Sequence, residues 1–444
     1  MMREASMLRA ALGPSRFCWR FTSSAASTST GATVNNATSE DTKLNKNLEA
    51  GGREERKVEK EKGSIKGALH APPASLVEAA LRPTHFRYAD ALIRHLKNSL
   101  VLHEPGRFIV LQKPYGISCV GHRQAGGGVF GSSVHDRKDD EEEEVEGGGR
   151  IEPLDRSPTI SECLPALARH FNEPALSFFT GLKRYVSGPL LLPCSSAEVK
   201  HIKKSIQAVS SAALSPCPLE EDGEEGEDQR DFLHSALAIC VGTPERGREA
   251  GVIDGYATFQ PVDSHKEYIF IEGGRAKKRA RTGKYAVAGG IKWRTIGQSD
   301  ELGCTLLEVQ CSKFARHLPR LALSHLSLPL LGDALYCRRF MDVDGRAVRV
   351  DPSSTSTQKK RRTQGFQFVP RALLDHLSLP PNALSQMPLY LHIYRTALPD
   401  YGKAQRIEDK LDLVASAPPP PHFMAMVEAL GFSKTLKRFW NEKV

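Results

Sequence analysis

The stretch GLKRYVSGPLLL, residues 181–192, decides the fold class of this chain. Its second half, Ser187–Leu192, is an apolar run of strand length, and the cations Lys183 and Arg184 stand just before it. Similar strand-like runs occur at 108–111, 233–241, 304–309 and 389–394. Helical patterns occur at 87–100, 163–171, 197–207 and 423–430, the last followed by Gly431 as a candidate C-cap. Strands mixed irregularly with helices predict an α+β fold rather than repeated βαβ units.

The first helical pattern, Arg87–Leu100, places Tyr88, Leu92, Leu96 and Leu100 on one face, which predicts that this face is buried. Order is expected to begin near Leu76, because the residues before it are polar and charged.

Composition narrows the class of protein. The 444 residues carry a net charge of +9, which favours a polyanionic partner. No apolar run reaches the roughly 18 residues that a membrane span needs. Nine cysteines are scattered without C-x-x-C pairs or zinc spacing, which predicts free thiols and no structural metal. No G-x-S-x-G, H-E-x-x-H, P-loop or dinucleotide-binding motif occurs, which argues against hydrolases of those classes and nucleotide enzymes.

The charge pattern predicts how the chain is organised. Residues 1–30 hold four arginines, one acid and a Ser/Thr tract, a composition typical of a mitochondrial transit peptide. The composition of residues 31–75 predicts a disordered charged linker. Residues 76–432 are expected to form a domain, and residues 433–444 a basic tail. Loop insertions are expected near 121–150, 215–230, 273–284 and 351–364. The third insertion contains Lys277, Lys278 and Arg279, which would track phosphates without reading sequence.

Four segments, in order, resemble the motifs of the RluA-type pseudouridine synthases. They are FIVLQKPYGISCVG (108–121), LKRYVSGPLLL (182–192), KFARHLPRLALSHLSLPLLGDALY (313–336) and LYLHIYRTALP (389–399). The family patterns are K-P-x-G, R-L-D-x-x-T-S-G-L-L-L, T-G-R-x-H-Q-[IL]-R with a later G-D-x-x-Y, and L-H-A. Within the family, the chain is most similar to the mitochondrial mRNA pseudouridine synthase branch, in which the catalytic motif is degenerate. The resemblance implies a mixed, mostly antiparallel central sheet with flanking helices.

The resemblance also implies a reaction, the isomerisation of uridine to pseudouridine in mitochondrial RNA, with no cofactor and no metal. The target base must leave its stack, and the family uses one aspartate that is ionised at neutral pH. Counting back from Ser187-Gly188, that position is Lys183 here. A protonated lysine beside Arg184 is a phosphate clamp rather than a nucleophile. Asp155, in the run Pro153-Leu154-Asp155-Arg156, is a rival carboxylate.

The family tyrosine that stacks on the base has two candidate positions. The frame HSALAICVG puts Ala236 in the tyrosine position and His234 in the lysine position of the family's K-x-Y. Tyr268, in Lys266-Glu267-Tyr268, also fits K-x-Y but comes later in the chain than the family order requires.

The resemblance implies RNA contacts by Lys113, Arg184, His317 and Arg320. Arg320 fits the arginine that pairs with the family's catalytic aspartate, so Lys183 opposite it predicts a cation pair that an RNA phosphate would bridge. Phe314 and Ala315 stand where the family has Gly-Arg.

Two functions follow. One is a synthase acting on RNA in the mitochondrial matrix, with isomerisation weak or lost. The other is a catalytically inactive RNA-binding factor in mitochondrial RNA processing or mitoribosome assembly, with proteins of those processes as partners.

Overall fold

The computed structural model describes residues 71–120, 157–179, 181–212, 232–245, 247–262, 265–273, 286–343, 346–349, 368–380, 383–384, 387–398, 401 and 413–443. All of them fall within one unit, Gly67–Val444. Several predictions concern residues outside this description. They are the transit peptide, the linker up to residue 70, Asp155, the insertions at 121–150, 215–230, 274–284 and 351–364, and the basic residues Lys277, Lys278 and Arg279.

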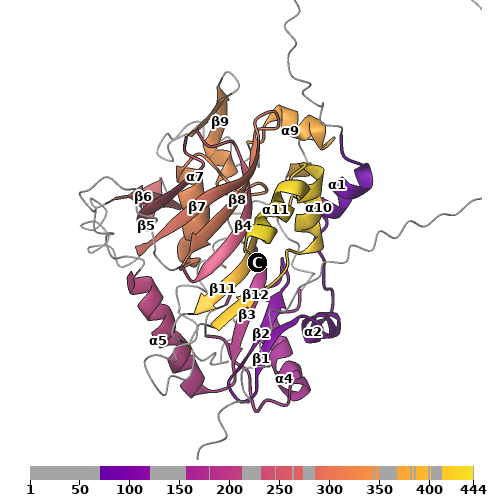
Figure 1. Ribbon diagram of the computed structural model, residues 1–444, viewed down its shortest axis with the longest axis vertical. Helices are drawn as coiled ribbons and strands as arrows, with labels where there is room; N and C mark the ends of the chain where they lie inside the picture. The colour runs from indigo at the N-terminus through magenta and orange to yellow at the C-terminus, as the bar shows by residue number, and fades with distance from the viewer. Residues whose placement is uncertain are drawn as a thin grey trace, which may run out of the picture. The chain divides into compact units, whose positions relative to one another are not determined.

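A seven-stranded sheet organises the described residues (Figure 1). Its strands are β4 (His234–Val241), β5 (Ala250–Val262), β6 (His265–Glu272), β7 (Val287–Ser299), β8 (Cys304–Cys311), β11 (Leu391–Leu398) and β12 (Leu413–Ser416). They lie in the order β12-β11-β4-β8-β7-β5-β6, and every neighbouring pair is antiparallel. Together with the helices that cover it, this sheet confirms the predicted α+β class.

A second, three-stranded antiparallel sheet consists of β1 (Leu100–Glu104), β2 (Phe108–Lys113) and β3 (Gly188–Pro193), in that order. It meets the large sheet where Ser187 and His392 form a single parallel bridge. The backbone N–H of Ile393 donates to the carbonyl of Ser187 at 2.8 Å. The quoted stretch 181–192 therefore lies where the two sheets join. A separate hairpin is formed by β9 (Phe340–Val343) and β10 (Arg346–Arg349).

Helices flank both sheets. They are α1 (Ala74–Leu81), α2 (Ala89–Lys97), α4 (Ile160–His170), α5 (Ser196–Ala212), α7 (Leu318–His325), α9 (Arg371–His376), α10 (Pro421–Ala429) and α11 (Ser433–Lys443). Two short 3-10 turns, Ala315–His317 and Cys337–Arg339, lie in the connection between β8 and β9. A capping box begins α4, because the Thr159 side chain accepts from the Glu162 N–H and the Glu162 carboxylate accepts from the Thr159 N–H.

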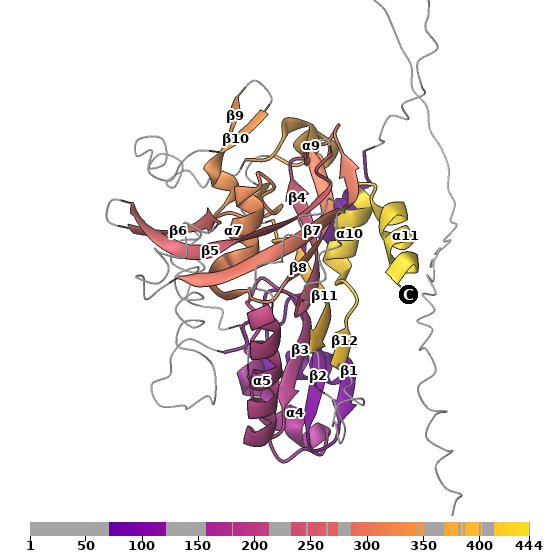
Figure 2. The same ribbon diagram turned by 60° about the vertical axis from the view of Figure 1, so that its left-hand side comes forward.

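Strand β4 divides the core, because its side chains alternate between the two faces of the sheet. Ala236, Ala238 and Cys240 join the cluster that contains α7, α2 and α4. Leu237, Ile239 and Val241 join the cluster that contains α1, α10 and α11. Figure 2 shows α7 and α11 on opposite sides of β4 and β8.

Several predicted elements extend differently from their patterns. Leu92 and Leu96 are buried as predicted, but Tyr88 is 66% exposed and Leu100 is 42% exposed. The reason is that α2 spans only Ala89–Lys97, and Leu100 already belongs to strand β1. The C-terminal residues, expected as a basic tail, form α11, whose Leu436 and Phe439 are buried.

Gly188 lies very close to Ile393 where the two sheets meet, and we predict that Gly188→Ala lowers the free energy of unfolding by about 2–3 kcal/mol. Its φ is +142°, and an added Cβ would lie 2.3 Å from the carbonyl oxygen of Ile393. Chemical denaturation of both proteins measures the difference. The matched control is Gly106→Ala, where φ is +74° and no atom lies within 4 Å of the added Cβ. It should cost only the backbone strain of about 1 kcal/mol. Equal losses in the free energy of unfolding for Gly188→Ala and Gly106→Ala would contradict the close approach of Gly188 to Ile393.

Candidate functional site

The turn 183–187 is held by the segment Lys113–Gly116. Lys113 is completely buried, and its ammonium donates to the carbonyl oxygens of Val186 at 2.8 Å, Pro114 at 3.1 Å and Arg184 at 3.4 Å. The Gly116 N–H donates to the Arg184 carbonyl at 2.9 Å, and the Arg184 Nε donates to the Gly116 carbonyl at 3.2 Å. The structure thus gives Lys113 the task of positioning this turn, although the resemblance implied a direct RNA contact.

A buried histidine fixes the far end of the same turn. The Ser187 hydroxyl lies 2.9 Å from His392 Nδ1, and His392 Nε2 lies 3.0 Å from the carbonyl oxygen of Ala417. Since a carbonyl can only accept, Nε2 carries the proton and the Ser187 hydroxyl donates to Nδ1. Burial lowers the pKa of His392 to about 4, so the ring is neutral at pH 7. Ser187 and His392, which both match family motifs, therefore tie the two sheets together.

The turn contributes Lys183 and Tyr185 to a group of side chains that we call the cation–aromatic cluster. It comprises Lys183, Arg316, His317, Arg320 and Arg339 together with the rings of Tyr185, Phe259, Tyr268 and Tyr336. The four formal cations and His317 are all at most 8% exposed. The Arg320 guanidinium carbon lies 4.4 Å from the centre of the Tyr185 ring and 5.1 Å from that of Tyr336. A cation at these distances is attracted to the face of the aromatic ring on which it stacks, and the attraction is stronger when the pair is desolvated.

His317 lies at the centre of the positive charge. Burial lowers the pKa of its imidazole well below the usual value, and the charges of Arg320, Lys183 and Arg339 lower it further. The ring is therefore neutral at pH 7, and its Nδ1 lies 2.9 Å from the Tyr336 hydroxyl. Lys183 is one of these three charges and therefore lies near His317.

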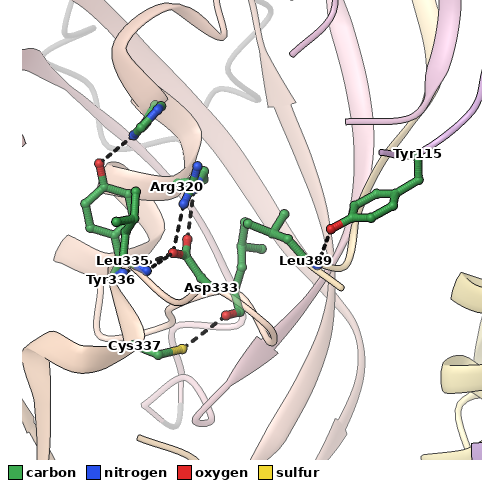
Figure 3. Close-up of polar contacts among 9 residues, drawn as sticks. Tyr115, Arg320, Asp333, Leu335, Tyr336, Cys337 and Leu389 are labelled. Atoms are coloured by element: carbon green, nitrogen blue, oxygen red, sulfur yellow. Dashed lines mark hydrogen bonds and ion pairs between the residues drawn. The ribbon is translucent and has the colours of Figure 1, made fainter. Parts of the chain in front are cut away.

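Arg320 has a carboxylate partner within the chain, and it is Asp333 (Figure 3). Arg320 Nε donates to Asp333 Oδ2 and Nη2 to Oδ1, both at 2.9 Å. Asp333 Oδ1 also accepts from the backbone N–H groups of Leu335 and Tyr336 at 3.0 Å. The predicted cation pair between Arg320 and Lys183 is therefore not the arrangement observed. The aspartate of the Gly332-Asp333 motif neutralises Arg320, so no phosphate is needed for that purpose.

Two consecutive residues before α7 adopt a left-handed backbone, Arg316 with φ +52° and His317 with φ +57°. This conformation is uncommon for residues other than glycine and concentrates at functional sites. It brings the Arg316 guanidinium carbon to 4.8 Å from the centre of the Phe259 ring. Phe314 and Ala315, which replace the family's Gly-Arg, stand directly before this pair.

The structure places the two candidate tyrosine positions very differently. The Tyr268 ring centre lies 4.2 Å from that of Phe259 and 5.0 Å from that of His317, and its carbonyl accepts from Arg339 Nη2 at 2.7 Å. Tyr268 therefore belongs to the cluster. Ala236 is buried in β4, on the same side of the sheet as α7, and offers only a methyl group. His234 contacts Thr396 instead, with Nδ1 2.9 Å from the hydroxyl.

Of the site residues predicted from the sequence, Lys183, His317, Arg320 and Tyr268 come together in the cluster. Lys113, Arg184 and Ala236 lie around it. The sequence reasoning missed Arg316, Arg339, Tyr185, Phe259 and Tyr336 as members of the cluster. A signal existed for three of them, because Arg316 precedes His317, Tyr336 ends G-D-x-x-Y and Tyr185 lies within the second motif segment. Arg339 and Phe259 lie outside the four motif segments and carried no signal.

The arrangement suits a polyanion with exposed bases. Guanidinium and ammonium groups bind phosphates, and aromatic faces stack on bases without regard to sequence. Within the described ranges, no group of three or more His, Cys, Asp or Glu side chains could hold a metal ion. The described helices include none that is long and apolar enough to cross a membrane.

Comparison with known proteins identifies relatives by sequence. The mitochondrial mRNA pseudouridine synthase Rpusd3 of Mus musculus is 32% identical over 136 residues, which are 30% of this chain and 35% of that protein. The mitochondrial mRNA pseudouridine synthase RPUSD3 of Homo sapiens is 32% identical over 130 residues, 29% of this chain and 33% of that protein. The matched region thus spans about a third of these curated relatives. No family model matches.

Two solved structures are also similar. Human RNA Pseudouridylate Synthase Domain Containing 4 has a TM-score of 0.46 and 17% identity, over 77% of this chain and 97% of that one. Human RNA Pseudouridylate Synthase Domain Containing 1 has a TM-score of 0.36 and 12% identity, over 74% of this chain and 85% of that one. The curated sequence matches confirm a resemblance to pseudouridine synthases over about 30% of this chain.

Proposed function

We propose that this chain belongs to the RluA-type RNA pseudouridylate synthase domain family and binds mitochondrial RNA through the cation–aromatic cluster. We further propose that isomerisation of uridine is weak or lost. One observation carries the proposal. Lys183, in the position of the family's catalytic aspartate, is 4% exposed and lies close enough to His317 to lower the pKa of its imidazole.

The reaction needs a carboxylate at this position. Pseudouridylation breaks the bond from ribose C1′ to uracil N1, and the family aspartate attacks the sugar or removes a proton from it. A protonated amine can do neither. Asp333, the carboxylate beside Arg320, is completely buried and accepts four hydrogen bonds. Its oxygens are therefore committed within the fold and do not substitute for the missing acid.

The same residues favour RNA binding. A base extruded from its stack would gain stacking on an aromatic ring such as Tyr268, which lies against Phe259, and Arg316 supplies positive charge over the Phe259 ring. The names of the two curated relatives refer to mitochondrial mRNA. With the transit-like composition of residues 1–30, they support action in the mitochondrial matrix, with RNA-processing or mitoribosome-assembly proteins as partners.

Mapping pseudouridine at single-base resolution in mitochondrial transcripts, after incubation with the purified full chain, tests the proposal. Wild type and Lys183→Ala should give the same low level of modification. Lys183→Ala should also reduce the slope of log affinity against log salt by about 0.7, the loss of one single-strand phosphate contact. Lys183→Arg, which keeps the charge, is the matched control and should retain the slope.

An active synthase is the competing function, and the intact turn geometry around Lys113, Ser187 and Gly188 favours it. It would be established by strong modification in wild type that disappears in Lys183→Ala while RNA affinity is unchanged. A salt-independent affinity would refute phosphate-dominated binding altogether.

A further inference from the structure

We propose that α5 carries a second RNA-contacting surface, a basic stripe formed by Lys200, Lys203 and Lys204, which binds phosphates of the strand held at the cation–aromatic cluster. The inference rests on the proposed function, since it extends the same RNA along the protein.

The stripe follows from the spacing and burial of α5. Residues three and four apart lie on one face of a helix, so Lys200, Lys203 and Lys204 point the same way, and all three are exposed. On the other face, Ile202 is completely buried against Phe108 and Leu398. The outward face of α5 is therefore basic along about one turn.

No acid of α5 neutralises this face. Glu198, the one acidic residue in this helix, is 9% exposed. Its carboxylate accepts from the Arg107 guanidinium at 3.2 Å and from the Tyr401 hydroxyl. The negative charge is thus directed inward, and the three ammonium groups face solvent together.

The topology carries the stripe back towards the cluster. Strand β3 starts at Gly188, five residues after Lys183, and α5 follows β3 after two residues and packs against β3 and β11. At about 1.5 Å of rise per residue, Lys204 lies roughly 12 Å along the helix from Ser196. Strand β3, of six residues, is about 17 Å long. The stripe therefore lies alongside the second sheet on the return path to the turn that contains Lys183.

Single-stranded RNA fits this surface better than a protein does. Lysines are mobile point charges that neutralise phosphates without fixed geometry. The stripe itself offers no exposed apolar side chain of the kind that anchors protein interfaces. The alternative partner is an acidic protein, and the test below distinguishes it from RNA.

The test compares two triple variants of the full chain. Lys200→Gln/Lys203→Gln/Lys204→Gln removes the stripe, and Lys434→Gln/Lys437→Gln/Arg438→Gln removes the same charge from exposed positions of α11. Helix α11 packs on the face of the sheet opposite α7. Affinity for 5-nucleotide and 20-nucleotide single-stranded RNA is measured by fluorescence anisotropy over a range of salt concentrations.

The α5 variant should bind the 20-mer about tenfold more weakly, and its salt slope should be about 2 smaller, the loss of three single-strand contacts. Its affinity for the 5-mer and both affinities of the α11 variant should change by less than about twofold. Equal losses in the two variants would overturn the inference in favour of a general charge effect. An unchanged affinity of the α5 variant for the 20-mer would also overturn the inference and would favour an acidic protein as the partner of the stripe. Failure of wild type to bind either RNA would instead refute the proposed function.

Discussion

Asp333→Asn is expected to lower the free energy of unfolding by about 3–5 kcal/mol, because it leaves the Arg320 guanidinium buried without its counter-charge. The substitution preserves shape, so packing around the side chain changes little. Both residues are at most 2% exposed, and the pair is bidentate. The change in free energy is read from urea denaturation of the two proteins at pH 7.

The matched control is Asp375→Asn, which breaks the exposed pair between Arg371 and Asp375, also at 2.9 Å. Its side chains are 84% and 61% exposed, so the loss should stay within about 0.5 kcal/mol. A second variant, Arg320→Met with Asp333→Leu, removes both charges and should cost less than Asp333→Asn. If Asp333→Asn lowered the free energy of unfolding no more than Asp375→Asn does, the buried ion pair between Arg320 and Asp333 would be contradicted.

The pair also shows what the sequence could and could not predict about the site. The motif frame identified Arg320 and Asp333 as matching residues and placed both in one segment. It could not show that they bind each other, because a partner 13 residues away depends on the 3-10 turns and on the path of α7. The family frame suggested the residue at position 183 as the partner instead, and that choice produced the predicted cation pair.

Lys113 illustrates the same limit. Its strand β2 was predicted from the apolar run 108–111, and its motif was recognised. A lysine usually keeps its ammonium in water, so an RNA contact was the natural expectation. Only the structure shows three backbone carbonyls of the segments around Pro114 and Val186 converging on the ammonium.

Two of the strands that the sequence did not predict, β5 and β7, lack a long continuous apolar run. Strands β5 and β7 each span 13 residues and contain glycines where other groups approach closely. At Gly289 an added Cβ would lie 2.5 Å from Leu318 Cδ2, and at Gly290 it would lie 2.0 Å from Asp254 Oδ1. Such positions lower the strand signal and at the same time let α7 pack against the sheet.

Acid should destabilise the fold strongly, through histidines that the structure buries in neutral form. Burial lowers the pKa of His392 to about 4 and that of His422 to about 4, from an unfolded value near 6.5. Between these values the unfolded chain binds protons that the folded chain excludes. Stability is therefore complete above about pH 6.5 and falls as the pH drops towards 4. Linkage gives about 3 kcal/mol for each histidine at pH 4, or about 6 kcal/mol together.

The urea midpoint measured at pH 7, 6 and 5 checks this profile. His422→Phe keeps an aromatic ring against Tyr115, whose ring centre lies 5.1 Å away, and removes one titrating group. It should reduce the loss of stability between pH 6 and 5 by about 1 kcal/mol. His170→Gln, at an exposed position, is the control for substitution itself. A profile that His422→Phe does not flatten would contradict a neutral, buried His422. The slope would then come from other histidines that the structure buries in neutral form, such as His392 and His317.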